Sequence, residues 1–234
     1  IFKNLGMTAL DVDGARIPVD DPRLDPLWAA VDTLDIPVLI HSGDPAEFWQ
    51  PHDRFNERWL ELKLRPRRIR PPEAFPPWEQ IMEEQRSLFR RWPGIDFISA
   101  HLHWMGNDLG RLGRILDEIP NMYVGLGAVL YELGRQPRFA REWLVRYQDR
   151  VLMGKDSYDR EEFNTYFRVF ETADEYFPYY RRYHAFWRMY GLDLPDDVLR
   201  KVYYENALRI IPGLDRSRFP GGAEPAQGES GRGG

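Results

Sequence analysis

Residues 36–44 read IPVLIHSGD, a short apolar run that passes directly into His41. Three further apolar runs are spaced along the chain: FISA at residues 97–100, MYVGL at 122–126 and VLM at 151–153. Continuous apolar runs of this length are typical of parallel strands that are covered on both faces. Between the runs lie segments with helical periodicity, and one such stripe is Leu109, Leu112, Ile115, Leu116 and Ile119. This alternation of strands and helices predicts an α/β fold built on a parallel sheet.

The composition excludes several classes of protein. The 234 residues are 43% hydrophobic and 14% aromatic, which is enough for a buried core and argues against wholesale disorder. Because there is no cysteine, a disulfide scaffold, a cysteine-ligated zinc site and a thiol nucleophile are excluded. The net charge of -5 does not favour a nucleic-acid partner. No apolar run approaches the roughly 18 residues of a membrane-spanning helix and no secretory signal is visible, so we expect a cytoplasmic protein without membrane contact.

The chain divides into one folded domain and a tail. From Arg216 onward the sequence reads RSRFPGGAEPAQGESGRGG, with almost no apolar side chains. A segment of this composition cannot bury enough apolar surface to offset the entropy of ordering. We therefore expect a domain over residues 1–214 and a disordered tail over residues 215–234.

Two long segments exceed a minimal strand–helix connection. The first, residues 44–90, contains the arginine-rich run RPRRIRPP at residues 65–72. This run is either an anion-binding edge of a lid or, more commonly for charge runs, a solvated loop stiffened by proline. The second, residues 159–190, is crowded with Phe, Tyr and Trp. Those aromatic side chains would line a substrate pocket or a subunit interface, or would pack helices against the sheet.

Three of the apolar runs end in a titratable side chain: His41, His101 and Asp156. In a parallel α/β barrel or sheet the carboxyl ends of the strands open on one face, where active sites gather. We therefore expect these three side chains to converge in one pocket. Strand alternation further predicts that the small residues Ser99 and Gly154 point inward and leave room below the site.

Two imidazoles and a carboxylate form a donor set for a divalent metal, with zinc the first expectation. Such a metal lowers the pKa of a bound water, and a His or Asp that is free of the metal can take its proton. Simpler interpretations exist, because a strand-end histidine often bonds only to backbone and Asp156 can merely cap a helix. The joint pattern favours His41, His101 and Asp156 as metal ligands, with catalytic roles for His101 and Asp156.

Four residues are weaker candidates for substrate binding. Lys3 would bind a carboxylate if the segment IFKNLG ends a strand, and otherwise lies at an edge. His103 follows His101 by two residues and is either a second ligand or a loop residue at the mouth of the site. Trp104 and Tyr158 indicate an apolar or aromatic acid as the small-molecule substrate.

Motifs of other enzyme classes are missing. Ser42 lies beside His41, but no G-x-S-x-G sequence surrounds it, which argues against a serine hydrolase. Neither G-x-G-x-x-G nor G-x-x-x-x-G-K-[ST] follows a predicted strand, so dinucleotide and P-loop sites lack support. The remaining histidines, His52 and His184, are interpreted as structural, and Lys155 is expected to point away from the site.

Seven segments carry a resemblance that covers nearly the whole folded domain. They are IFKNLGM, VDDPRLDPLWAAVDTLDIPVLIHSGDPAEFWQP, NERWLEL, FISAHLHWMGNDLGRLGRILDEIPNMYV, ELGRQPR, YQDRVLMGKDSY and YENALRIIPGL. Together they resemble the amidohydrolase-2 family, metal-dependent TIM-barrel hydrolases related to aminocarboxymuconate-semialdehyde decarboxylase. The resemblance implies a divalent metal, usually zinc, at the carboxyl ends of the barrel strands. It also implies that His41 ends the fifth strand as a metal ligand, that His101 ends the sixth and activates water or binds a second metal, and that Asp156 ends the eighth, ligates the metal and shuttles a proton.

The sequence departs from the family pattern at two points. The family's first-strand His-x-His pair belongs upstream of the IFKNLG segment, and the His101-Leu102-His103 run is not that pair because it lies on the sixth-strand pattern. The eighth-strand motif reads Gly-Lys-Asp rather than the frequent Gly-Thr-Asp, which keeps the carboxylate. The resemblance therefore implies the C-terminal portion of a (β/α)8 TIM-barrel, about strands 4 to 8, with only part of the metal site.

The first functional hypothesis is a metal-dependent hydrolase that uses metal-activated water on a C–N or C–O bond. The alternatives are a metal-dependent decarboxylase of a small aromatic or muconate-like acid, and a catalytically incomplete barrel that serves as a binding or scaffold protein. We expect Ile1 to be a truncation point, and the isolated chain to be inactive, to expose unpaired strand edges and to aggregate. Because the family commonly forms oligomers, a homo-oligomer is compatible with the surplus of aromatic residues.

Overall fold

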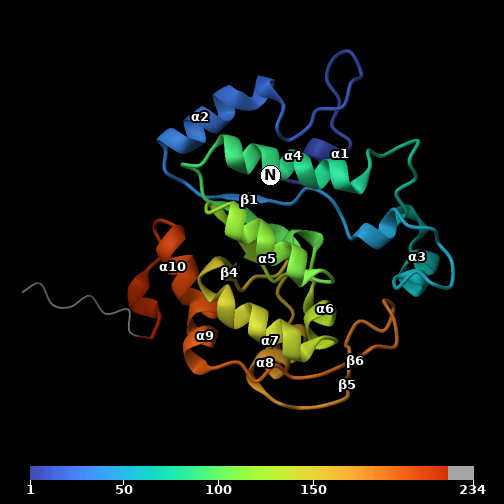
Figure 1. Cartoon of the computed structure of the whole chain (residues 1–234), viewed down its shortest axis with the longest axis vertical. Coiled ribbons are helices and arrows are strands. Elements are labelled where there is room, and N and C mark those ends of the chain that lie inside the picture. The colour runs from blue at the N-terminus through green and yellow to red at the C-terminus, as the bar shows by residue number, and fades with distance from the viewer. Residues whose placement is uncertain (221–234) are drawn as a thin grey trace, which may run out of the picture.

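The computed structural model describes residues 1–220 and is built on a four-stranded parallel sheet (Figure 1). The strands are β1 (Val38–Ile40), β2 (Phe97–Ser99), β3 (Met122–Gly125) and β4 (Val151–Leu152), and they lie side by side in chain order. Each strand falls on one of the four apolar runs. Helical crossovers join the parallel neighbours, as in an α/β fold of the TIM-barrel type. The predicted fold class is therefore confirmed.

Two helices precede the first strand, and the others fill the connections between the strands or follow the last of them. They are α1 (Asn4–Met7), α2 (Asp25–Thr33), α3 (Trp59–Leu64), α4 (Trp78–Arg91), α5 (Leu109–Glu118), α6 (Leu130–Gly134), α7 (Pro137–Arg146), α8 (Arg160–Glu171), α9 (Asp196–Arg200) and α10 (Asn206–Ile210). Two short antiparallel strands, β5 (Phe177–Pro178) and β6 (Arg188–Met189), form a hairpin after α8. The hairpin matters for function because its connecting loop reaches the candidate site.

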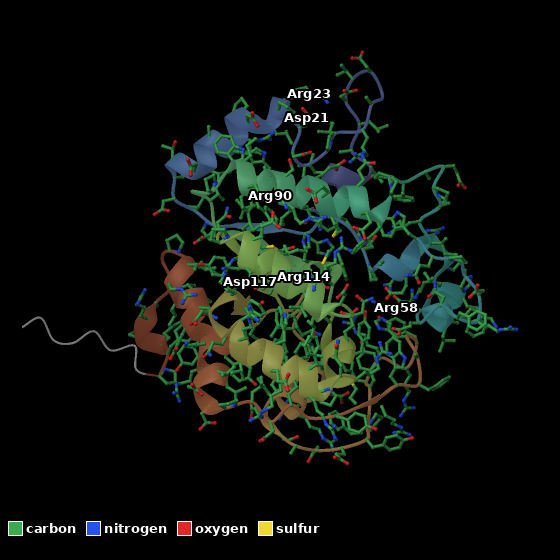
Figure 2. All side chains as sticks on the ribbon, in the orientation of Figure 1. Asp21, Arg23, Arg58, Arg90, Arg114 and Asp117 are labelled. Atoms are coloured by element: carbon green, nitrogen blue, oxygen red, sulfur yellow. The ribbon has the colours of Figure 1, made fainter. Side chains whose placement is uncertain are left out.

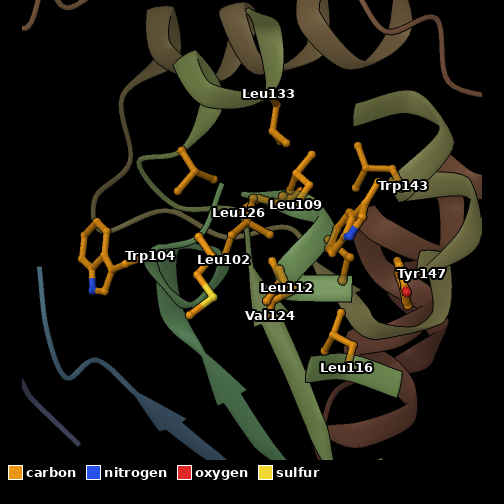
Figure 3. Packing of buried hydrophobic residues seen from close by; sticks show 14 of the residues in the cluster. Leu102, Trp104, Leu109, Leu112, Leu116, Val124, Leu126, Leu133, Trp143 and Tyr147 are labelled. Carbon is orange, nitrogen blue, oxygen red and sulfur yellow. The ribbon is translucent and has the colours of Figure 1, made fainter. Parts of the chain in front are cut away.

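One face of the sheet is covered by α4, α5 and α7. Phe97 and Met122 from the strands are buried there with Phe89 of α4, Leu112 of α5 and Trp143 of α7. Figure 3 shows this layer at close range, with the helical side chains packed onto the strands. Burying a side chain of this size contributes about 1.5–3 kcal/mol. The layer therefore fixes the strands, and with them the residues that follow their carboxyl ends.

The opposite face of the sheet is only partly covered. Ile98 and Leu152 pack there against Ile210 of α10 in a small separate cluster. Leu39 of β1 lies on the same face and is 56% exposed. This face therefore presents apolar surface on its β1 side.

The first residues extend the sheet without forming a regular strand. The Ile1 amino group donates to the Leu39 carbonyl at 2.6 Å, and the His41 amide donates to the Ile1 carbonyl at 2.9 Å. This is the hydrogen-bond pattern of a parallel neighbour. The strand expected at IFKNLG is thus reduced to this pairing, because α1 begins at Asn4.

The first residues of the expected tail have local structure. Residues 216–218, assigned to the tail from sequence, form a 3-10 turn that is closed by the Asp215 side chain. Phe219 stacks on Tyr204 with ring centroids 5.5 Å apart. Residues 221–234 lie outside the described part of the chain, so disorder there stays a prediction. Within residues 1–220, none of the helices combines the length and apolar character needed to cross a membrane.

Gly43 gives a first testable prediction, because it sits at a crowded left-handed position after β1. Its φ is +88°, and a Cβ there would lie 2.6 Å from the Met82 Cε and 3.2 Å from the Trp104 Cδ1. Gly14 has a similar φ of +81° with nothing within 4 Å, so it provides a matched control. Both alanine variants carry a backbone cost of about 1–2 kcal/mol, and Gly43→Ala adds an overpacking cost of about 1–3 kcal/mol. Urea unfolding measures the difference; equal losses in the two variants would contradict the predicted clash.

Candidate functional site

The three residues at the strand ends lie together. His41 follows β1, His101 follows β2 and Asp156 follows β4. The rings of His41 and His101 meet edge to face with centroids 4.5 Å apart. The His101 Nε2 atom lies 3.5 Å from the Asp156 Oδ1 atom. The convergence of His41, His101 and Asp156 expected from the sequence is therefore present. Their roles as metal ligands and catalytic residues stay predictions.

These residues line a pocket of about 160 Å³. Five cationic side chains contribute to its wall, namely Lys3, Arg58, Arg68, Arg70 and Arg181. They face three carboxylates, from Asp44, Glu61 and Asp156. With neutral histidines the wall therefore carries an excess of positive charge. An anionic ligand fits such a wall better than a cationic one.

His101 is held in a defined orientation. Its Nδ1 atom lies 2.7 Å from the Gly127 carbonyl oxygen, which can only accept, so the proton is on Nδ1. The Nε2 atom then carries a lone pair, and it is buried with no hydrogen-bond partner in the described chain. Burial lowers the pKa of the imidazole, so the ring is neutral at pH 7. Trp104 stacks on the ring at 4.2 Å and fixes its plane. A neutral, oriented imidazole nitrogen therefore faces Asp156.

The backbone after β2 breaks the strand alternation, because residues 101–104 all adopt left-handed angles, with φ between 51° and 58°. His101 therefore does not share a face with Ser99. Alternation within β2 places Ser99 with Phe97 on the helix-covered face, so Ser99 does not point inward beneath the site as expected. Its hydroxyl instead shares a hydrogen bond of 2.8 Å with the His103 Nδ1 atom. Such a run of strained residues is typical of sites where function fixes the geometry.

His103 and Tyr158 lie away from the pocket. His103 is 1% exposed and packs near Phe89 of α4, where burial lowers its pKa to about 3. Tyr158 is 81% exposed and contacts Phe163. Neither position supports the substrate-binding role considered from sequence. Trp104, by contrast, lines the pocket, and Figure 3 shows it at the end of β2 apart from the aliphatic layer.

Asp156 is reached by solvent, and its side chain is 59% exposed. The side chain of the preceding residue, Lys155, is buried and pairs with Glu162 of α8, so it does not line the pocket. Gly154 leaves open space, since a Cβ there would meet nothing within 4 Å. It borders a cavity of about 130 Å³ beneath His101 and Asp156. The room below the site predicted at Gly154 is therefore present.

Lys3 is held at the pocket by a carboxylate. The Lys3 Nζ atom donates to Asp44 Oδ1 at 2.9 Å, and Arg70 donates to Asp44 Oδ2 through Nη2 at 2.6 Å and Nε at 2.9 Å. Asp44 thereby orients both cations, and the Lys3 ammonium keeps two further donors. The arginine-rich run thus contributes Arg68 and Arg70 to the pocket wall and is not simply a solvated loop.

Sequence reasoning missed two buried residues of the site, Arg58 and His184. Arg58 is 3% exposed and bonds to Glu61 at 2.6 Å and to the Tyr131 hydroxyl at 2.6 Å. His184, interpreted as structural, is 2% exposed and lines the pocket 3.4 Å from Arg58. No local pattern links positions 126 apart. The NERWLEL segment, which contains Arg58, entered the sequence analysis only through the family resemblance.

The donor atoms fit part of a metal site. The His101 Nε2 and His41 Nδ1 atoms are buried without partners, and the carboxylate of Asp156 lies beside His101. Imidazole and carboxylate are suitable donors for a divalent metal. Among residues 1–220, however, no group of three or more such side chains is placed to hold a metal ion.

A family model described as Amidohydrolase matches residues 5–213 of this chain. Among solved structures, 2,6-dihydroxybenzoate decarboxylase from Rhizobium superimposes with a TM-score of 0.50 at 16% identity, over 86% of this chain and 59% of that one. A dihydroxybenzoic acid decarboxylase from Polaromonas sp. JS666, with bound manganese and the inhibitor 2-nitroresorcinol, superimposes with a TM-score of 0.50 at 12% identity. The match covers 94% of this chain and 61% of that one. A TIM-barrel protein from Bordetella bronchiseptica superimposes with a TM-score of 0.48 at 18% identity, over 83% of this chain and 52% of that one.

At these identities the likeness to solved structures shows the fold alone. The chain spans 52% to 61% of the length of those three structures. No curated protein sequence matches it significantly.

Proposed function

The chain belongs to the amidohydrolase family, and from this premise we propose that it forms the site of a metal-dependent decarboxylase of small carboxylic acids. One observation carries the proposal: the neutral His101 imidazole presents a free Nε2 atom to Asp156 inside a pocket lined by an excess of cations. The solved structures of similar fold that act on dihydroxybenzoates support the same direction.

The cationic wall accounts for the substrate class. Lys3 keeps free donors although it is paired with Asp44, and Arg181 pairs with Glu162 through Nε and Nη2 only. Both side chains line the pocket and can donate to a carboxylate. Trp104 and Phe48 add apolar wall beside them, which suits an aromatic or unsaturated acid.

His101 and Asp156 would carry the proton. In decarboxylation the bond to the carboxylate carbon breaks, carbon dioxide leaves, and the electron pair stays on the remaining carbon, which takes one proton. Gly127 and Trp104 orient the ring so that its Nε2 atom, a free acceptor in the neutral form, would take up a proton from Asp156 and pass it to that carbon. Asp156 lies 3.5 Å away and reaches solvent, so it can return the proton to His101 after each turnover.

His41 and Asp156 are the residues that would hold the metal. When bound, a divalent metal supplies a Lewis acid that polarises an oxygen of the substrate. Oxygen and nitrogen donors without thiolate suit manganese as well as zinc. Zinc was the first expectation from sequence, but this donor set does not favour zinc over manganese.

Product analysis tests the proposal. The intact protein that carries this chain is incubated with Mn²⁺ and 2,6-dihydroxybenzoate, and carbon dioxide is measured against substrate consumed. We expect equimolar release. Consumption without carbon dioxide would favour hydrolysis, and no consumption across a panel of aromatic and muconate-like acids would favour a non-catalytic barrel.

A further inference from the structure

The loop between β5 and β6 closes one side of the pocket. It carries Arg181 and His184 to the same cavity that His101 and Asp156 line. Figure 1 shows the loop rising beside the segment that carries α3, and Figure 2 shows Arg58 in that region. His184, the histidine of this loop, is buried, with 2% exposure. It is not used in the proton transfer described above.

The contacts of His184 define its tautomer. Arg58 Nη1 lies 3.4 Å from the His184 Nδ1 atom, and the Tyr179 hydroxyl lies 3.2 Å from the same atom. A guanidinium has only donors, so Nδ1 must be the acceptor and the proton must lie on Nε2. Burial and the charge of Arg58 lower the pKa of His184 to about 2, so the ring stays neutral at all ordinary pH values. His184 therefore presents a neutral Nε2–H donor, and that atom is buried with no hydrogen-bond partner in residues 1–220.

The charges around this donor are positive on balance. Glu61 lies 3.7 Å from the His184 Nε2 atom, too far for a hydrogen bond. Its carboxylate is shared by two cations, Arg58 and Arg68. Two positive charges against one negative charge leave a local excess that favours an anionic oxygen next to the free N–H group.

The two histidines present opposite hydrogen-bonding groups to the pocket. His101 donates through Nδ1 and keeps an acceptor at Nε2, whereas His184 accepts through Nδ1 and keeps a donor at Nε2. The first end suits proton transfer, and the second suits recognition of an oxygen that takes no part in the reaction. A buried donor without a partner costs free energy unless a ligand satisfies it.

We propose that His184, supported by Arg58, forms a subsite for a second anionic group of the substrate, so that the preferred substrates are small dicarboxylic acids. This inference rests on the proposed function and narrows it to a substrate class. The second carboxylate would accept the Nε2–H hydrogen bond of His184, while the reacting carboxylate lies towards His101.

Binding measurements test the subsite without catalysis. Calorimetric titrations of the intact, Mn²⁺-loaded protein compare benzoate with phthalate, isophthalate and terephthalate. A hydrogen bond to a charged group predicts that at least one dicarboxylate binds about tenfold tighter than benzoate. His184→Phe removes the donor and should abolish that preference. His184→Gln keeps an N–H donor near the Nε2 position and should retain most of the preference.

His52→Gln serves as the matched control, because His52 is exposed and bonds to the Trp59 carbonyl at 3.0 Å outside the pocket. Thermal unfolding of each variant separates a lost subsite from a lost fold, and the glutamine variant decides if the phenylalanine variant does not fold. The subsite is contradicted if no dicarboxylate binds more tightly than benzoate, if the preference survives in a folded His184→Phe, or if a folded His184→Gln loses it. If dicarboxylates bind more tightly than benzoate but no carbon dioxide is released, the proposed reaction is contradicted and the subsite is supported.

Discussion

Replacing His101 by asparagine is expected to lower the rate constant of carbon dioxide release by about 10²–10⁴-fold. Asparagine can still donate to the Gly127 carbonyl, and it tolerates the left-handed backbone at this position. The variant therefore keeps the turn and the pocket but loses the Nε2 atom that faces Asp156. Initial rates at saturating substrate measure the effect.

His52→Asn provides the control for this substitution, since His52 is exposed, bonds to the Trp59 carbonyl and does not line the pocket. The rate in that variant should equal the wild-type rate. A His101→Asn protein that folds and releases carbon dioxide at the wild-type rate would remove His101 from the mechanism. A change confined to the Michaelis constant would reassign the residue to binding.

Arg58→Met is expected to destabilise the fold by about 3–5 kcal/mol, the cost of removing one partner of a buried ion pair. The change leaves Glu61 buried and removes the hydrogen bond to the Tyr131 hydroxyl. Arg68 remains beside Glu61, but its side chain is 40% exposed and more weakly held. The free energy of unfolding in urea measures the loss.

Arg90→Met (Arg90 is labelled in Figure 2) is the control, because the Arg90 side chain, unlike that of Arg58, is 40% exposed and its partners Glu83 and Glu118 are exposed as well. Exposed pairs of this kind contribute about 0–1 kcal/mol. Removing the second partner as well, in Arg58→Met with Glu61→Leu, should recover part of the lost stability. Equal losses of unfolding free energy in Arg58→Met and Arg90→Met would show that the buried contacts of Arg58 with Glu61 and Tyr131 stabilise the fold no more than a surface ion pair.

Much of the fold was predictable from local patterns. The four apolar runs that contain Val38, Phe97, Met122 and Val151 all form strands, although the sheet face that carries Leu39 is only partly covered. The titratable residues that follow them then converge because parallel strands point the same way. The segment IFKNLG was harder, since one pair of hydrogen bonds at Ile1 is all that remains of the expected strand.

The parts that were not predictable depend on contacts between distant segments. Four successive left-handed residues turn His103 into the core, and no sequence pattern marks such a turn. His184 meets Arg58 across 126 positions, so its place in the pocket follows from the loop between β5 and β6 and not from its neighbours. Lys3 lines the pocket because Asp44, fixed by Arg70, holds it there.

The most direct test of the central claim is a manganese titration of the intact protein, followed by the electron paramagnetic resonance signal of free Mn²⁺. The account predicts saturable binding in the wild type and at least about tenfold weaker binding in both His41→Ala and Asp156→Asn. Unchanged affinity in both variants would contradict the assignment of the site at the carboxyl ends of β1, β2 and β4.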